Sequence, residues 1–180
     1  MFIKVLMNIH NFYERSNSMD KYGKILKKKT DSYSLTLCSL NKLDNYRNIM
    51  KEQYDSGYTQ VIVNTDLMLK IIESMLKKNW VLLRVEIDDP SVDEETLQEI
   101  TILVDKIKEN VLNFNRLKEY LEWALDDGSI FIDKIKISII EGVQKINCEI
   151  NSNGLMYGNN NNFVFDNFIK GIIERYLNEA

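Results

Sequence analysis

Apolar residues recur at alternating steps of three and four along residues 92–126, which is the pattern of one long amphipathic helix. The apolar seam runs through Leu97, Ile100, Val104, Ile107, Val111 and Phe114, and then shifts to Leu117, Leu121 and Leu125. At about 1.5 Å per residue, such a helix would measure roughly 52 Å. A folded domain of 180 residues has a radius of gyration of only about 16 Å. We therefore expect the helix to break near residues 113–115 or to project from the body of the domain.

The segments before this helix alternate between strand and helix patterns. We expect strands at residues 2–7, 32–38, 58–64 and 80–87, and helices at residues 41–57 and 65–80. Residues 8–30 fit either a helix or a loop that leads into the first arm of a hairpin. Gly57 suits the end of the first helix, and Thr65 or Asp66 suits the N-cap of the second.

The strand, helix and strand pattern within residues 58–87 predicts a crossover unit with a parallel pair of strands. Residues 80–87 are almost wholly apolar, so they are expected to form a central strand that is buried on both faces.

Residues 129–140 and 145–151 alternate apolar and polar side chains, which predicts an antiparallel hairpin with one buried face. Asn153 and Gly154 form a strong turn pair, so a third short strand is expected after them. The last segment predicts an amphipathic helix in which Gly171, at a penalty of about 1 kcal/mol relative to alanine, would permit close packing. Its apolar face consists of Phe165, Phe168, Ile169, Ile172, Ile173, Tyr176 and Leu177.

These patterns together predict a single globular domain of mixed α+β class spanning residues 1–180. Strand–helix alternation comes first, followed by the long central helix, an antiparallel hairpin or meander, and the C-terminal amphipathic helix. The content of 44% hydrophobic and 28% charged residues is typical of a globular chain. Cys38 and Cys148 lie in alternating apolar stretches and are expected to be small buried side chains. Because no secretory signal and no membrane-length apolar run is present, we expect a cytoplasmic protein without a membrane partner.

Charge is distributed unevenly along the chain. Residues 1–30 contain seven basic and two acidic side chains, whereas residues 86–127 contain thirteen acidic and four basic ones. The acidic part begins with Asp88, Asp89, Asp93, Glu94 and Glu95. This stretch fits a helix start, with Ser91 and Glu94 at capping-box spacing and carboxylates near the positive end of the helix dipole.

Catalytic templates find few matching residues here. His10 is the only histidine, and no glycine spacing resembles a phosphate-binding loop. We therefore expect no metal or other cofactor. One enzymatic alternative stays open, a magnesium-dependent hydrolase with carboxylates near residues 86–93. Its candidate ligands are Glu86, Asp88, Asp89, Asp93, Asp126 and Asp127.

The hypothesis that these observations favour is a non-catalytic module that binds another protein through an acidic helical surface. The residues expected to contact the partner are Asp93, Glu94, Glu95, Glu99, Asp105 and Glu109. The alternative is a nucleic-acid-associated regulator that uses the basic residues of segment 21–29, namely Lys24, Lys27, Lys28 and Lys29. Because acids flank the helix seam, pairing with a second copy of the helix would be repulsive, so we expect the seam to pack within the chain.

Overall fold

The computed structural model describes residues 21–30, 35–40, 45–87, 92–126, 131–141, 144–158 and 163–179. The strand expected at residues 2–7 and the residues His10, Asp88, Asp89 and Ser91 lie outside the described residues. Among the helices that the structure describes, none combines the length and the apolar content that a bilayer crossing requires.

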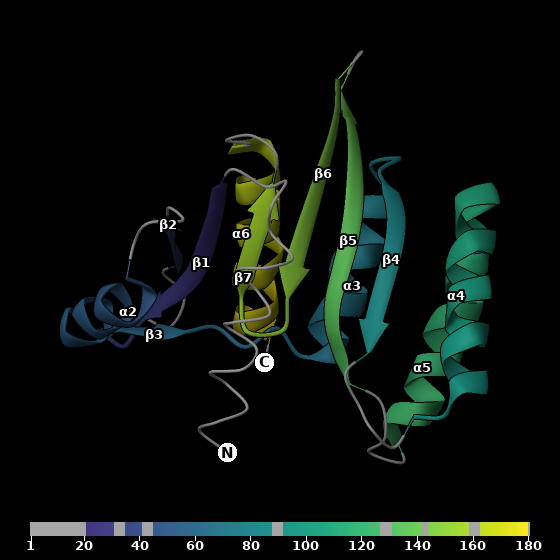
Figure 1. Cartoon of the computed structure of the whole chain (residues 1–180), viewed down its shortest axis with the longest axis horizontal. Coiled ribbons are helices and arrows are strands. Elements are labelled where there is room, and N and C mark those ends of the chain that lie inside the picture. Colours follow the sequence, from purple (N-terminus) through teal and green to yellow (C-terminus); the bar gives the residue numbers. More distant parts are fainter. Residues whose placement is uncertain are drawn as a thin grey trace.

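Within the described residues, seven strands form one sheet in which every pairing is antiparallel. They are β1 (Lys21–Lys28), β2 (Leu35–Leu40), β3 (Tyr58–Gln60), β4 (Val81–Ile87), β5 (Ile132–Glu141), β6 (Gln144–Asn151) and β7 (Leu155–Gly158). The order across the sheet is β2-β1-β7-β6-β5-β4, and β3 pairs with the end of β1 (Figure 1). The helices of the described residues are α2 (Tyr46–Asp55), α3 (Thr65–Leu76), α4 (Glu94–Glu109), α5 (Phe114–Asp126) and α6 (Phe163–Glu179), with a 3-10 turn η1 (Val111–Asn113). The expected mixed α+β class is confirmed.

The parallel pair expected within residues 58–87 is wrong. β3 pairs with β1, whereas β4 pairs with β5 at the far edge of the sheet, and both pairings are antiparallel. In the described sheet, β4 is therefore an edge strand and not a central one. Its apolar sequence has another cause: α4 packs against β4, and Val85 and Ile87 pack against the main core.

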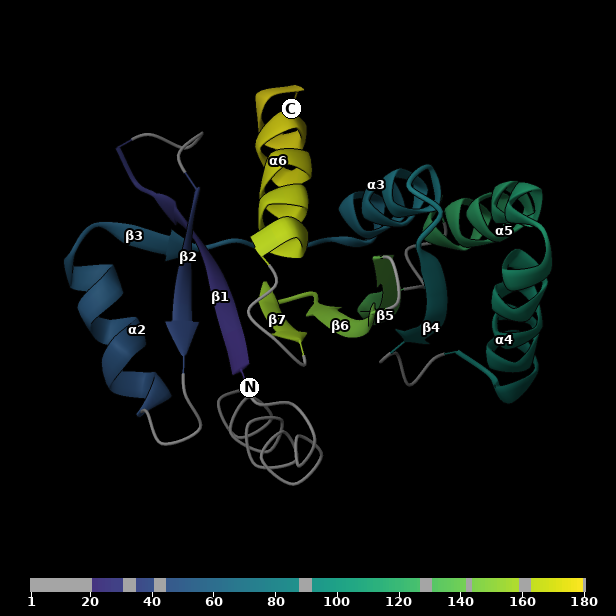
Figure 2. The same ribbon diagram turned by 90° about the horizontal axis from the view of Figure 1, so that it is seen from above.

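The two faces of the sheet bury separate apolar clusters. The larger cluster lies between the sheet and α3, α4, α5 and α6, and the smaller one lies beneath α2 on the opposite face (Figure 2). Met156 belongs to the larger cluster, and its neighbours Leu155 and Tyr157 belong to the smaller one. Successive side chains of a strand point to opposite faces, so β7 is buried on both.

The C-terminal half agrees with its sequence patterns. β5 and β6 form the expected antiparallel hairpin, with Ile135, Ile137 and Ile139 buried. The turn before β7 is confirmed, because Gly154 has φ of 78°. The apolar face of α6 packs into the larger cluster as expected. The close packing expected at Gly171 is wrong, since a Cβ at this position would meet nothing within 4 Å.

The long helix breaks at Asn110, slightly before the expected position. The Asn110 backbone is extended (φ −149°, ψ 113°), and its side chain accepts from the N–H of Leu112. α4 and α5 then pack against each other at the end of the sheet (Figure 1). Within the seam, Ile100, Val104, Ile107 and Phe114 are buried, whereas Leu97 and Val111 are 39% and 48% exposed.

The capping residues of two helices differ from expectation. The N-cap of α3 is Asn64 and neither Thr65 nor Asp66, because Asn64 Oδ1 accepts from the N–H of Leu67 at 3.0 Å. The helix start expected in the acidic stretch is confirmed, but its cap is Asp93 and not Ser91. Asn45 caps α2 in the same way, and Gly57 follows that helix with φ of 88°. Both corrections concern short polar residues that compete for one capping position.

Candidate functional site

The outward face of α4 carries the acids that were expected to contact a partner. α4 lies at one end of the molecule beside β4, far from α2 (Figures 1 and 2). All of the predicted partner-contact residues are exposed, namely Asp93, Glu94, Glu95, Glu99, Asp105 and Glu109. The structure therefore brings these carboxylates together on one solvated helix.

Asp93 differs from the other acids because it has a structural task. Its Oδ1 accepts from the N–H of Thr96 at 2.8 Å. This backbone hydrogen bond, helped by one from the Thr96 side chain, lowers the pKa of Asp93. A carboxylate at this position also faces the positive end of the helix dipole. Asp93 is thus mainly the cap of α4.

Ile102 lies at the centre of the outward face and is 52% exposed. Residues three or seven apart share a helix face, so Glu99 and Asp105 flank Ile102 on either side, and Glu95 and Glu109 lie one further turn away. A single exposed apolar side chain is ordinary on a protein surface. Ile102 is notable because it is the apolar centre of a surface whose surroundings are charged.

The carboxylates around Ile102 differ in how far their charge is compensated. Asp105 accepts from Lys108 at 2.6 Å within the same helix. Within the described residues, Glu95, Glu99 and Glu109 form no ion pair with any lysine or arginine. Their charges are therefore available to an external cation.

The basic segment 21–29 does not form one continuous surface. Lys24 is fully buried on β1, and its Nζ donates to the backbone carbonyl of Asn153 and, over 3.4 Å, to Oε1 of Gln60. Lys27 is half-buried, whereas Lys28 and Lys29 are exposed. Lys29 Nζ additionally donates to the backbone carbonyl of Tyr54 at 3.2 Å. The run of lysines in the sequence is thus divided between the interior and the surface.

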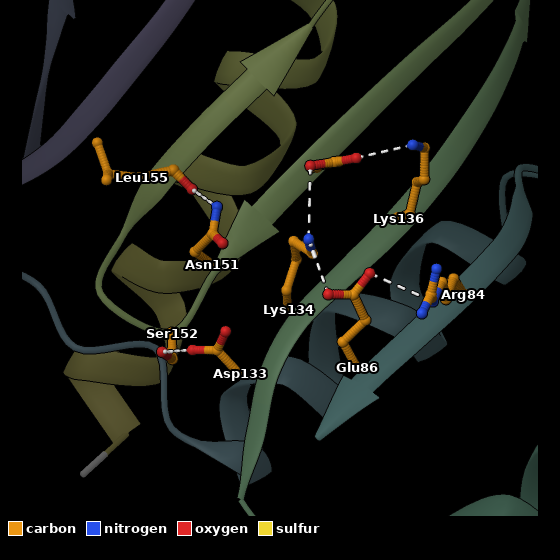
Figure 3. Close-up of polar contacts among 9 residues, drawn as sticks. Arg84, Glu86, Asp133, Lys134, Lys136, Asn151, Ser152 and Leu155 are labelled. Carbon is orange, nitrogen blue, oxygen red and sulfur yellow. Dashed lines mark hydrogen bonds and ion pairs between the residues drawn. The ribbon is translucent and has the colours of Figure 1, made fainter. Parts of the chain in front are cut away.

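A ladder of ion pairs crosses the face of the sheet opposite the larger cluster (Figure 3). Lys134 lies 2.8 Å from Glu86 and 4.0 Å from Glu149, and Glu149 lies 2.8 Å from Lys136. Arg84 extends the ladder, with its Nε 3.2 Å from Glu86. Antiparallel register places Glu86, Lys134 and Glu149 near one another on β4, β5 and β6. Alternating charge stabilises this face locally.

Polar contacts also hold the turn between β6 and β7 at the end of this face (Figure 3). Ser152 Oγ lies 2.9 Å from Oδ1 of Asp133, and the Asn151 side chain donates to the carbonyl of Leu155 at 3.2 Å. Ser152 further accepts from the N–H of Val63 through its backbone carbonyl at 2.7 Å. The bond from Val63 holds the segment between β3 and α3 against the turn, and the other two hold the turn itself.

The ladder bears on the hypothesis of a magnesium-dependent hydrolase. Glu86 is a candidate ligand, but its two carboxylate oxygens face Arg84 and Lys134. Asp93 is turned toward the start of α4, and Asp126 ends α5. Asp88, Asp89 and Asp127 lie outside the described residues. In the part of the chain that the structure describes, no three acidic, histidine or cysteine side chains converge as a metal site would require.

The sequence patterns did not single out Ile102 or the ion-pair ladder. Ile102 could have been found as the one isoleucine of residues 94–109 that falls outside the seam. The ladder could not be found in this way, because it depends on which strands pair and in which register.

Comparisons with protein-family models, with curated proteins and with solved structures found no significant match to this chain.

Proposed function

We propose that this chain is a protein-binding module that docks a partner protein on the outward face of α4. The observation that carries the proposal is the exposure of Ile102, 52%, at the centre of a face where Glu95, Glu99 and Glu109 form no ion pair within the described residues. Apolar contact supplies affinity in protein interfaces, and charge around it supplies orientation and partner choice. This combination favours protein binding over a purely solvated helix face.

The nucleic-acid alternative receives less support from the geometry. Lys24 is buried and Lys29 is engaged with the Tyr54 carbonyl, so the phosphate contacts available to segment 21–29 are reduced. Each lost phosphate contact lowers both affinity and its dependence on salt. The acidic helix would in addition repel a polyanion.

The test is site-specific photo-crosslinking in the native cell. p-Benzoylphenylalanine replaces Ile102 in one variant and Ile62 in a matched control, because Ile62 is also exposed, at 56%, and lies after β3, at a distance from α4 (Figure 1). We expect a discrete crosslinked protein from position 102 and none of the same size from position 62. The same protein should copurify with the wild-type chain and should be absent when the Ile102→Asp variant is purified instead.

Equal crosslinking from both positions, or copurification that is indifferent to Ile102→Asp, would contradict a docking surface on α4. Circular dichroism of each variant checks that the fold is retained, and Ile62→Asp serves as the control for a new surface charge. Tight binding of a DNA or RNA duplex that Lys28→Ala and Lys29→Ala abolish would instead favour the nucleic-acid alternative.

A further inference from the structure

The backbone of α4 limits the ways in which a partner can bind. Its N–H and C=O groups are used inside the helix between Glu94 and Glu109, so an extended peptide cannot add to it as a strand adds to a sheet edge. A partner must contact the side chains of a convex surface. A second helix does this well, because its side-chain ridges fit the grooves of the first at an axial distance of about 8–10 Å.

Five side chains form one stripe along the outward face of α4. Glu95, Glu99, Ile102, Lys106 and Glu109 follow one another at steps of four, three, four and three, so they lie on the side opposite the buried seam. Ile102 is the one apolar member of this outward stripe, and the other four are charged. A helix laid along the stripe would therefore meet a single apolar contact with charges on both sides. The stripe covers fourteen residue steps, or about 21 Å along the helix axis.

The charge of the outward stripe selects the partner. Glu95, Glu99 and Glu109 form no ion pair within the described residues, and Lys106 is the one base among the stripe positions. A second copy of α4 would bring like charges together and be repelled. A helix with lysine or arginine beside its apolar residue would be attracted, and it would leave Lys106 facing a neutral or acidic position.

We infer that the partner binds α4 as a basic amphipathic helix, with an apolar side chain on Ile102 and basic side chains on Glu95, Glu99 and Glu109. This inference rests on the proposed function and specifies the chemistry of the partner. Asp105 contributes less than the other acids, because a partner cation must first displace Lys108, which lies 2.6 Å from it.

The experiment measures the binding of designed helical peptides to the full chain by fluorescence anisotropy at about 50 mM salt, where charge contacts are weakly screened. The first peptide carries a leucine seam flanked by lysines, the second carries the same seam flanked by glutamates, and the third is a scrambled form of the first. We expect binding of the first peptide alone. Raising salt to about 500 mM should weaken it strongly.

Two triple variants test the site. Glu95→Gln, Glu99→Gln and Glu109→Gln together should weaken binding by about tenfold or more, because three charge contacts are lost. The control combines Glu52→Gln, Asp55→Asn and Asp66→Asn, which are exposed acids of α2 and α3 and change the net charge equally. It should alter the dissociation constant by less than about twofold, since those acids are remote and screened.

A single variant tests the apolar centre, since Ile102→Ser should also weaken binding whereas Ile62→Ser should not. Equal losses in the two triple variants would reduce the effect to bulk charge and overturn the inference, as would equal binding of the scrambled peptide. A crosslinked partner that requires Ile102 but is not displaced by the basic peptide would also overturn the inference while leaving the proposed function intact. Absence of any partner dependent on Ile102 would instead refute the proposed function itself.

Discussion

The ammonium group of Lys24 donates a hydrogen bond to the backbone carbonyl oxygen of Asn153, which lies 129 positions later in the chain. This bond joins β1 to the turn between β6 and β7, next to Gly154, whose carbonyl accepts from the N–H of Ile25 at 2.9 Å. Lys24 is fully buried. The hydrogen bond from Lys24 holds the turn in place, but burial of the charged ammonium group carries a desolvation penalty.

The first prediction concerns pH. Burial lowers the pKa of Lys24 from 10.5 to about 8. Between these values the unfolded chain binds more protons than the folded chain, so stability should rise with pH from about 8 to about 10.5. Below pH 8 both states are protonated and the penalty is fully present. Urea unfolding at pH 7, 8, 9 and 10 should show this rise in the wild type and not in Lys24→Met.

At pH 7, Lys24→Met should be more stable than the wild type by on the order of 1 kcal/mol. Removal of the desolvation penalty should raise the free energy of unfolding by about 3 kcal/mol for a pKa shift of this size. Loss of the two hydrogen bonds should lower it by about 1 kcal/mol for each bond. A large destabilisation by Lys24→Met would show that the hydrogen bonds outweigh the penalty.

The pH series ends at 10 because of Tyr46. Burial raises the pKa of Tyr46 to about 12, which lowers stability only as the pH passes about 10.

A second prediction compares two isoleucines of α4. Ile107 is 2% exposed in the larger cluster and Ile102 is 52% exposed. Ile107→Ala should lower the free energy of unfolding by about 2–5 kcal/mol, because it leaves a cavity. Ile102→Ala should change it by less than about 0.5 kcal/mol. Urea unfolding measures both, and a comparable loss in the two variants would mean that the outward face is also covered.

The seam itself gives a related test. Ile107→Glu should unfold or strongly destabilise the monomer in sedimentation and circular dichroism, because it buries an unpaired charge. Conversion of a stable dimer into a stable folded monomer would instead mean that this seam packs between two copies of the chain.

The third prediction concerns the ion-pair ladder. Lys134 is 17% exposed and lies between Glu86 and Glu149, whereas Lys136 is 35% exposed and, among the described residues, forms an ion pair with Glu149 only. Lys134→Ala should cost about 1–3 kcal/mol, because the partly buried Glu86 keeps only the exposed Arg84 as its ion-pair partner and Glu149 keeps only Lys136 within the described part of the chain. Lys136→Ala should cost about 0–1 kcal/mol, as more exposed pairs do. Urea unfolding at low and high salt distinguishes the two, and equal costs would contradict a central role for Lys134.

Two glycines provide the fourth prediction. Gly154 has φ of 78°, and a Cβ there would lie 2.8 Å from the carbonyl oxygen of Val61. Gly154→Ala should therefore lower the melting temperature markedly. Gly171→Ala should raise stability by about 0.5–1 kcal/mol, because its Cβ meets no atom and alanine favours the helix. Thermal unfolding decides both, and a destabilising Gly171→Ala would mean that α6 packs more closely at this point.

Much of the fold follows from patterns formed by residues that lie close together in the sequence. The β5–β6 hairpin, the turn at Gly154, the apolar face of α6 and the mixed α+β class were predicted correctly. Hairpin register and helix amphipathicity are set by residues within about ten positions of one another. The acidic surface of the candidate site was predictable for the same reason, since its residues share one helix.

The tertiary structure alone decided where distant segments meet. The apolar sequence of β4 is compatible with either a central or an edge strand. The position of β4 in the sheet follows only from its pairing with β5 and from the packing of α4 against it. Lys24 and Lys28 belong to one basic run in the sequence, yet β1 turns the first into the interior and leaves the second in solvent. Composition and spacing thus indicated most of the helices and strands and where the acids gather, whereas the conformation of residues 21–28 stayed open until β1 was seen to pair with β2. Which charges are buried, paired or free depended on strand pairing between residues far apart, because that pairing is selected by the total apolar surface it buries and not by local preference.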